Sequence, residues 1–313
     1  MNITRQRAIQ GALAALVIPS AAFAQAALPT VKVGTQPAEF TADIMYGIQE
    51  GFFQKAGVSI DLQYLTNGNI TSEAILSGAV DVGLNDTLGV AQAHVRGVDL
   101  VFLSPAAEFA SPWPTGFVTL PEANIRTAAD FNNKTIGTRG LRSAPNMMAS
   151  AWIDNNGGDS KTIKWTEIVS TTAIAAIRAH RIDGVLIGEP YFTQAKEEGL
   201  RITLLDHNPP SNAWMVNGWA ARRSWADANP DLVRRFTTAM RDANHWANTH
   251  EAATYPIVAA YTKIPQDVVA KMMSHPWIET LTPSLVQPVI DVCAKYGVLS
   301  RNFPAAEIFY TAH

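Results

Sequence analysis

The sequence predicts an α/β fold built as two lobes with mostly parallel sheets, and three observations support this prediction. Apolar strand-like runs alternate with stretches of helical spacing, which is typical of βαβ units. The chain has 313 residues, which is longer than a single hydrophobic core usually grows. Short segments also recur about 103 residues later, as Val33-Gly34-Thr35 and Ile136-Gly137-Thr138 do.

The composition excludes several classes of protein. With 47% hydrophobic residues and a formal charge of −3, the chain is too apolar and too weakly charged to be disordered. The same small charge argues against a nucleic-acid partner, which would select a basic surface. A single cysteine, Cys293, can form neither an internal disulfide nor a Cys-x-x-Cys site. We therefore expect a globular protein without a disulfide framework.

Residues 1–24 predict a cleaved signal peptide. Arg5 and Arg7 form a basic start, the stretch 8–22 is apolar, and Ala22-Phe23-Ala24 has the small-x-small pattern of a cleavage site. The apolar stretch is shorter than the about 20 residues that span a bilayer. A buried N-terminal helix is the alternative interpretation. Cleavage would leave 313 − 24 = 289 residues, and the sequence then predicts export to the periplasm.

The first set of elements follows this segment. Pro37 ends the first strand, Ile44, Ile48 and Phe52 have the spacing of one helix face, and Gly57 precedes the next strand. The predicted order is strand 31–34, helix 44–53, strand 59–65, a helix from residue 70, and strand 80–84.

A second set repeats this order. It comprises strand 134–137, helix 144–155, strand 163–169, a helix that begins at Ser170, and strand 182–187. Asp81 and Asp183 occupy the same place in the two sets, where a helix turns into a strand, so we expect both to form turns. The rest of the chain is mostly helical, and the proline-rich patches 111–114 and 208–211 are the expected crossings between lobes.

The candidate binding residues follow from the sheet. Ligands of open parallel sheets bind beyond the carboxyl ends of the strands, often at helix N-termini that attract anions. Arg139 and Arg142 add forked donors for an anionic group, and Trp214 would form an aromatic wall. The alternative is that these residues cap helices or pack in the core. The predicted ligand-binding set is Gln36, Asn69, Asn85, Asp86, Arg139, Arg142, Ser143, Thr171, Glu189 and Trp214.

Signals of catalysis and of metal binding are weak. His245 and His250 are five residues apart and so do not share a helix face. No His-Glu-x-x-His, Gly-x-Ser-x-Gly or Walker-type motif occurs, and Cys293 lies in an apolar helical stretch. We therefore predict no catalytic residue, no metal and no cofactor.

Five segments in fixed order carry a resemblance to a known family. The chain resembles the substrate-binding proteins of bacterial ABC importers in the nitrate/taurine/sulfonate group, which is also similar to proteins that handle the pyrimidine precursor of thiamine. The resemblance covers nearly the whole chain after the signal segment. Each of the five segments opens with one of the following runs, in chain order: Glu50-Gly51-Phe52-Phe53, Ala74-Ile75-Leu76-Ser77-Gly78-Ala79-Val80-Asp81, Ala129-Asp130-Phe131-Asn132-Asn133-Lys134, Ile182-Asp183-Gly184-Val185 and Asn229-Pro230-Asp231-Leu232.

The resemblance implies a type II periplasmic binding protein fold with hinge crossings. Lobe 1 would hold residues 28–106 and 212–313, and lobe 2 would hold residues 107–211. The implied partners are a small organic solute and an ABC permease in the inner membrane, with the protein itself a monomer.

The chain departs from the family in one loop. Where sulfonate binders offer small hydroxyl residues, residues 139–146 offer only Ser143 beside two arginines. This difference favours a larger or carboxylated solute, and Asp86 opposite the arginines would suit an amphoteric or pyrimidine-like one. An enzyme on the same fold, dehydratase-like or pyrimidine-precursor synthase-like, and a ligand sensor subunit are the alternatives.

Overall fold

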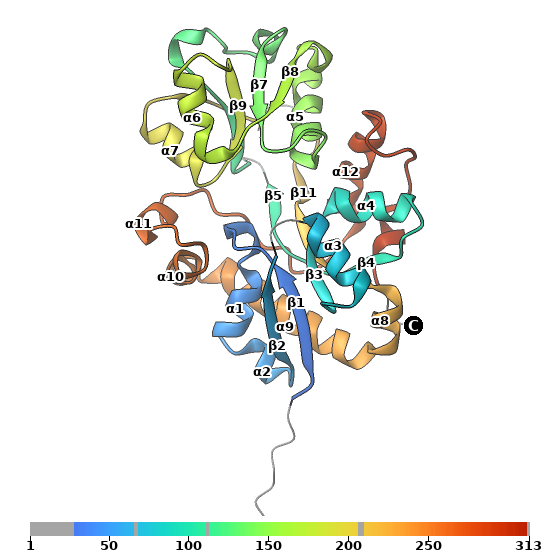
Figure 1. Cartoon of the computed structure of the whole chain (residues 1–313). Coiled ribbons are helices and arrows are strands. Elements are labelled where there is room, and N and C mark those ends of the chain that lie inside the picture. The colour runs from blue at the N-terminus through green and yellow to red at the C-terminus, as the bar shows by residue number, and fades with distance from the viewer. Residues whose placement is uncertain (1–27, 66–67, 111–112, 206–209, 312–313) are drawn as a thin grey trace, which may run out of the picture.

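The computed structural model describes residues 28–65, 68–110, 113–205 and 210–311. The predicted signal peptide therefore lies outside the described residues. Two five-stranded sheets lie one above the other in Figure 1, each with its own helices. We call the part around the sheet that begins with β1 lobe 1, and the part around the sheet that holds β7 lobe 2. The predicted two-lobed α/β fold is confirmed.

The sheet of lobe 1 has the strand order β2-β1-β3-β12-β4. Strand β1 pairs in parallel with β2 and β3, whereas β12 runs antiparallel to β3 and β4. Four of the five strands therefore point the same way. Their bounds are Thr30–Thr35 for β1, Ser59–Tyr64 for β2, Val82–Asp86 for β3, Leu100–Pro105 for β4 and Asn217–Arg222 for β12.

The sheet of lobe 2 repeats this plan in the order β10-β6-β9-β7-β8. Strand β7 pairs in parallel with β8 and β9, and β6 is antiparallel to β9 and β10. The antiparallel strand of each sheet is thus the one next to a crossing between lobes. The bounds are Thr115–Thr119 for β6, Thr135–Thr138 for β7, Lys164–Glu167 for β8, Gly184–Gly188 for β9 and Arg201–Leu204 for β10.

The repeat extends to side-chain packing. A Cβ atom on Gly34 would lie 2.7 Å from Leu65 Cδ1, and one on Gly137 would lie 2.7 Å from Ile168 Cγ2. Leu65 N donates to Thr35 O, and Ile168 N donates to Thr138 O. Each first strand therefore needs glycine at the same place, because the side chain after the second strand covers it.

The two turn aspartates are also equivalent. Asp81 Oδ2 accepts from Lys32 N at 2.9 Å, and Asp183 Oδ2 accepts from Thr135 N at 2.7 Å. Each carboxylate thereby satisfies a backbone donor of the first strand. The prediction that Asp81 and Asp183 form turns is confirmed.

The helices cover both sheets. The expected helix 44–53 is two helices, because Gly51 between them has φ 72° and ends the first one. Helices α3, α4, α5, α6 and α7 follow strands, and α8 to α12 form the C-terminal part (Figure 1). The bounds are Asp43–Gln49, Phe52–Lys55, Gly68–Ser77, Thr87–Val95, Ala144–Asn155, Ser170–Arg178, Tyr191–Glu197, Arg223–Ala228, Pro230–Thr249, Glu251–Thr262, Gln266–Val269 and Pro283–Lys295 for α1 to α12.

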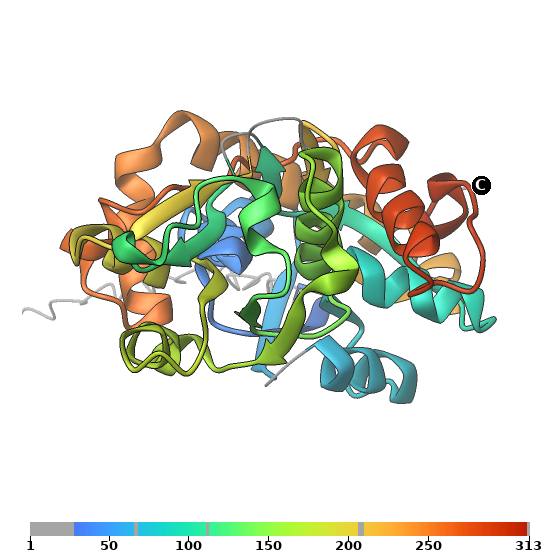
Figure 2. The same ribbon diagram turned by 90° about the horizontal axis from the view of Figure 1, so that it is seen from above.

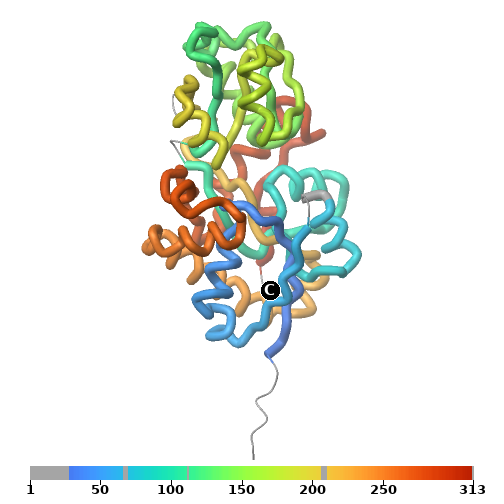
Figure 3. Tube along the Cα trace, turned by 60° about the vertical axis from the view of Figure 1, so that its left-hand side comes forward, coloured from blue at the N-terminus to red at the C-terminus, as the bar shows by residue number. Residues whose placement is uncertain are grey.

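Two segments cross between the lobes. Strands β5 (Glu108–Ala110) and β11 (Ala213–Met215) form an antiparallel pair beside the expected crossings, of which residues 111–112 and 208–209 lie outside the described residues. A third segment from the C-terminal part lies along the same strands, since Glu108 N donates to Pro276 O and Ile278 N to Ala106 O, both at 2.9 Å. In Figure 3 these segments form the narrow waist of the molecule.

The C-terminal part contacts lobe 2 on two opposite sides. Viewed from above in Figure 2, α10 and α11 lie on one side and α12 on the other. On the first side, Met273 N donates to a Glu189 carboxylate oxygen at 3.0 Å. On the second, Arg142 Nη2 donates to Gly297 O at 2.7 Å, and the Tyr296 hydroxyl donates to Asp154. Within the described part of the chain, no helix is long and apolar enough to cross a bilayer.

Candidate functional site

Arg139 is a predicted site residue of lobe 2 that lies near an aromatic ring of lobe 1. It directly follows β7 in lobe 2, and its side chain is exposed. Its guanidinium carbon lies 6.0 Å from the centroid of the Phe40 ring, which belongs to the loop after β1 in lobe 1. At this distance a guanidinium is attracted to the ring face. Arg139 and Phe40 thus bring the two lobes together at the carboxyl ends of their first strands.

Asp86 places a negative charge in the same region. It closes β3 in lobe 1 and caps α4, because its carboxylate accepts from Gly89 N at 2.7 Å. The carboxylate is exposed, yet the surrounding protein desolvates it and raises its pKa, while the positive charge of Arg139 acts in the opposite direction. Asp86 and Arg139 are therefore close enough across the lobes to interact electrostatically.

Two buried amides next to these residues have donors without acceptors. Asn85 Oδ1 accepts from Ser72 Oγ at 2.8 Å, and Asn146 Oδ1 accepts from Arg142 N at 3.1 Å. Both asparagines are 1% exposed, and no described residue accepts from either Nδ2. A buried unpaired donor costs roughly 1–3 kcal/mol. An acceptor such as a carboxylate or sulfonate oxygen would remove that cost.

The loop between β7 and α5 is held by its own contacts. Ser143 caps α5 and donates to Gly140 O at 2.8 Å. Arg142 adopts a left-handed backbone with φ 60°, and its guanidinium donates to Gly297 O. The structure therefore uses Arg142 to join lobe 2 to the end of α12. Of the two arginines, only Arg139 lies against Phe40 and acts on Asp86.

Glu189 is occupied by structural contacts. The carboxylate accepts from Thr193 N at 3.1 Å, from Thr193 Oγ1 at 2.9 Å and from Met273 N at 3.0 Å. Desolvation raises its pKa, although these hydrogen bonds oppose the shift. Glu189 lies two residues before α7 and joins the C-terminal segment to lobe 2.

Three other predicted residues lie in the loop or helix that follows a strand. The Gln36 carbonyl accepts from Thr41 Oγ1 at 2.6 Å and from the Tyr261 hydroxyl at 2.8 Å, which fixes the loop after β1. Thr171 lies exposed in the first turn of α6. Asn69 lies in α3, and its side chain is outside the described residues.

Trp214 is placed differently from the expected aromatic wall. Its side chain is 0% exposed and packs in the hinge, with ring centroids 4.7 Å from Phe109 and 5.9 Å from Trp113. Burial of three large rings at the crossing strands stabilises the hinge. In this conformation a solute between the lobes has no Trp214 surface to contact.

The sequence gives no signal for a buried acid–base pair at the hinge. Glu39 Oε2 lies 2.5 Å from His275 Nδ1, and the two side chains are 10% and 4% exposed. The His275 ring stacks on Phe109 with a centroid separation of 5.1 Å. The residues are 236 positions apart, so only the fold brings them together. The pair fixes the C-terminal segment that lies along the crossings to the turn after β1, and His275 Nε2 is buried without a partner among the described residues.

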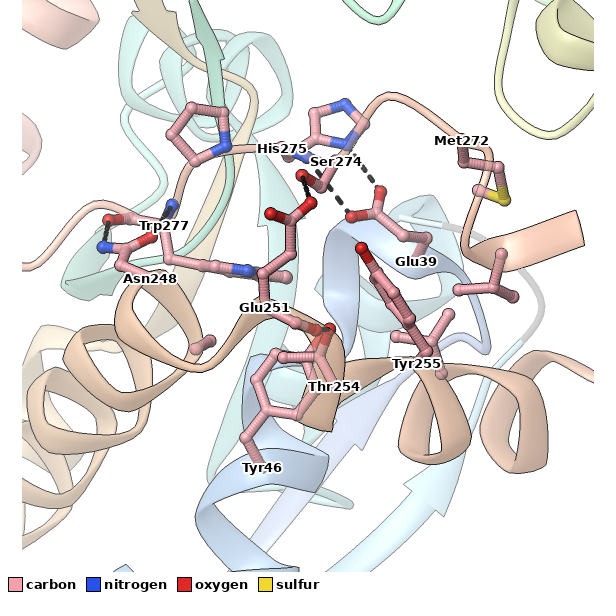
Figure 4. Close-up of a pocket in the computed structure, with 14 residues that line it drawn as sticks. Glu39, Tyr46, Asn248, Glu251, Thr254, Tyr255, Met272, Ser274, His275 and Trp277 are labelled. Atoms are coloured by element: carbon pink, nitrogen blue, oxygen red, sulfur yellow. Dashed lines mark hydrogen bonds and ion pairs between the residues drawn. The ribbon is translucent and has the colours of Figure 1, made fainter. Parts of the chain in front are cut away.

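A pocket lies beside this pair (Figure 4). Its volume is about 230 Å³, and every described residue that lines it comes before residue 47 or after residue 246. The pocket is therefore built by lobe 1 and the C-terminal part without residues of lobe 2.

The chemistry of the single thiol argues against a nucleophilic role. Cys293 is buried in α12, and burial raises the pKa of its thiol to about 12. The described ranges contain no group of three or more His, Cys, Asp or Glu side chains that could hold a metal ion.

Solved structures with the same architecture place the chain in a fold class. The periplasmic aliphatic sulphonate binding protein SsuA of Escherichia coli aligns with a TM-score of 0.73 at 17% identity, over 91% of this chain and 92% of that one. The alkanesulfonate-binding protein SsuA of Xanthomonas axonopodis pv. citri, bound to MOPS, aligns with a TM-score of 0.71 at 17% identity, over 90% and 98%. The desulfurization enzyme DSZB aligns with a TM-score of 0.68 at 12% identity, over 90% and 96%. The fold is that of the two-lobed periplasmic binding proteins, and it is shared by an enzyme.

The family follows from the sequence match. The family model described as NMT1/THI5 like matches residues 40–253, which is more than half of the chain. The chain therefore belongs to the NMT1/THI5-like family, in agreement with the resemblance seen in the sequence. No curated protein sequence matches it significantly.

Proposed function

We propose that the protein is the extracytoplasmic solute-binding protein of an ABC importer and captures a small organic solute between its two lobes. The hinge would close on the solute, because the closed state alone offers contacts from both lobes. We assign residues 28–106 and 212–313 to lobe 1 and residues 107–211 to lobe 2. Arg142, Glu189 and Trp214 make structural contacts, and the predicted ligand-binding residues that remain part of this proposal are Gln36, Asn69, Asn85, Asp86, Arg139, Ser143 and Thr171.

One observation carries the proposal: a cation of lobe 2 meets an acid and an aromatic ring of lobe 1. Arg139 lies over Phe40 and acts electrostatically on Asp86. This arrangement suits an amphoteric or anionic solute with a flat apolar part. The unpaired amide donors of Asn85 and Asn146 favour acceptor oxygens on the same solute.

The family relatives fit this function. Sulfonate-binding proteins and the periplasmic nitrate-binding protein NrtA of Synechocystis PCC 6803 share the fold. Such proteins deliver solutes to a membrane permease, so we propose an ABC permease as partner and the periplasm as location. The predicted signal peptide at residues 1–24 would direct the export.

A matched pair of variants tests the site. Thermal shift with sulfonates, aromatic carboxylates and pyrimidines should identify a solute that raises the melting midpoint with concentration. Arg139→Ala should then weaken its binding about 10- to 100-fold, since a hydrogen bond to a charged group contributes about 1.5–3 kcal/mol. Arg142→Ala should leave affinity nearly unchanged and lower only the stability, because its guanidinium is bound to Gly297 O. Equal affinities for both variants and the wild type would contradict the proposed site.

An enzyme on the same fold is the second candidate, because DSZB shares the architecture. The Glu39–His275 pair is the acid–base arrangement that such an enzyme could use, although the two side chains are largely buried in this conformation. Chromatographic recovery of the bound solute after long incubation distinguishes the two. Unchanged solute supports binding, and a new product supports the enzyme.

A further inference from the structure

The pocket in Figure 4 is a site separate from the space between the lobes. Its lining comes from Glu39 after β1, Tyr46 of α1, the end of α9, helix α10, and residues 269–277 of the C-terminal segment. At about 230 Å³ it is smaller than the roughly 300–1,000 Å³ of pockets for drug-sized ligands. A ligand for it would have only a few heavy atoms.

The pocket is negatively charged. Glu39 and Glu251 line it from opposite sides, and no lysine or arginine is among the described lining residues. His275 is the one lining side chain that could carry a positive charge, and its Nδ1 faces Glu39. Glu251 begins α10 and accepts from Ser274 Oγ at 3.0 Å, which leaves acceptor positions on its carboxylate.

Desolvation and the negative charge raise the pKa of two tyrosine hydroxyls that line the pocket. Desolvation raises the pKa of Tyr255, and the charge of Glu251 raises it further. Desolvation also raises the pKa of Tyr46, and the charge of Glu39 adds to that shift. The same field that opposes a phenolate favours a cation.

Aromatic side chains complete the lining. Tyr46 and Trp277 are in contact, with ring centroids 5.5 Å apart, and Tyr255 enters from α10 with its hydroxyl toward the carboxylates (Figure 4). Carboxylates combined with aromatic rings are the groups that recognise organic ammonium ions. A metal ion would instead need three or more ligating groups, which the described residues do not bring together here.

We propose that this pocket binds a small organic ammonium ion, held by Glu251 and Glu39 and enclosed by Tyr46, Tyr255 and Trp277. The contacts already present do not account for the pocket. Glu251 complements the N-terminal end of α10, and Glu39 fixes His275, but neither role requires a hollow lined by both acids.

Calorimetric titration with ethylammonium and with tetramethylammonium chloride tests the site. Each titration is repeated with sodium chloride at the same ionic strength, because simple screening of acidic residues would act for any salt. We expect saturable binding of at least one probe. Tighter ethylammonium binding would show that the carboxylates dominate, and tighter tetramethylammonium binding would show that the rings do.

Variants separate this site from the solute site. Glu251→Gln should weaken ammonium binding about tenfold or more, whereas Glu122→Gln, an exposed glutamate of lobe 2, should leave it unchanged. Tyr255→Phe provides a second variant that keeps the ring and removes the hydroxyl. Arg139→Ala should bind the ammonium probe like the wild type, whether or not the proposed solute site is correct. No saturable binding of either probe, or equal binding by Glu251→Gln, would overturn the proposal.

Discussion

The two lobes share one strand plan, but the side chains at their strand ends have different tasks. Each third strand leads into an acid: Asp86 closes β3, and Glu189 follows β9. Asp86 accepts one backbone hydrogen bond, from Gly89 N, and is exposed. Glu189 accepts from three donors and joins lobe 2 to Met273. The same kind of residue is thus exposed in one lobe, where we propose that it contacts the solute, and joins two segments in the other.

The first helix of each lobe shows a further difference. Helix α5 of lobe 2 is capped by Ser143, and the buried polar residue of its first turn is the neutral Asn146. Helix α1 of lobe 1 starts with Asp43, which is fully buried and accepts from Trp219 Nε1 at 2.8 Å. Of the first helices of the two lobes, as far as the structure describes them, the one in lobe 1 therefore carries a buried ionisable group and the one in lobe 2 does not.

The largest expected effect concerns the pH dependence of Asp43. Burial raises its pKa from 3.8 to about 7, so between these values the folded state holds a proton that the unfolded state has lost. The free energy of unfolding should therefore fall as pH rises, by about 2 kcal/mol between pH 5 and pH 7. Urea unfolding at several pH values measures this slope.

Asp43→Asn should flatten that slope, since the first turn of α1 then lacks an ionisable group. Asp61→Asn, an exposed aspartate of the same lobe, is the control and should keep the slope. If Asp43→Asn retains the full slope, another group is responsible and the contrast between the first helices fails.

Substitution of the two packed glycines tests the shared strand plan. Gly34→Ala and Gly137→Ala should each lower the free energy of unfolding by about 2 kcal/mol, because both Cβ atoms would overlap a covering side chain. Chemical denaturation of the two variants gives the comparison. Gly140→Ala is the control and should keep the stability of the wild type, because a Cβ atom on Gly140 would lie no closer than 3.6 Å to any neighbouring atom. Unequal losses for Gly34 and Gly137 would show that the two sheets are packed differently.

A smaller effect separates the two strand-end acids. Glu189→Gln should lower the free energy of unfolding by about 1–2 kcal/mol, because an amide cannot accept from all three donors. Asp86→Asn should cost less than about 0.5 kcal/mol, since asparagine caps a helix as well as aspartate does. Its effect should fall on solute affinity. Melting midpoints compared with binding isotherms test this division, and a large loss of stability in Asp86→Asn would contradict it.

The repeated plan was predictable because it is written in local patterns. Alternation of strands and helices, and the recurrence of Gly34 and Asp81 as Gly137 and Asp183, are properties of short segments. In the structure, the two glycines pack in the same way, and the two aspartates accept equivalent backbone hydrogen bonds. The family match at residues 40–253 agrees with the resemblance that these segments carried.

The sequence could not predict which charged side chains at the strand ends make structural contacts with distant segments. Arg139 and Arg142 are three residues apart and chemically identical, yet the left-handed backbone at Arg142 directs its guanidinium to Gly297 in another part of the chain. The Glu39–His275 pair and the contact of Glu189 with Met273 likewise join distant segments. Such pairings depend on the C-terminal segment that lies along the crossings, for which the sequence has no local signal.

The most direct test of solute capture between the lobes is a distance measurement across them. Spin labels on Glu73→Cys in α3 and Ala175→Cys in α6 report the separation by pulsed electron resonance, and the buried Cys293 should not be labelled. Saturating solute should shorten and narrow the distance distribution in the wild-type background, and Arg139→Ala should abolish that change at the same solute concentration. A distribution that solute leaves unchanged, despite tight binding, would contradict capture by hinge closure.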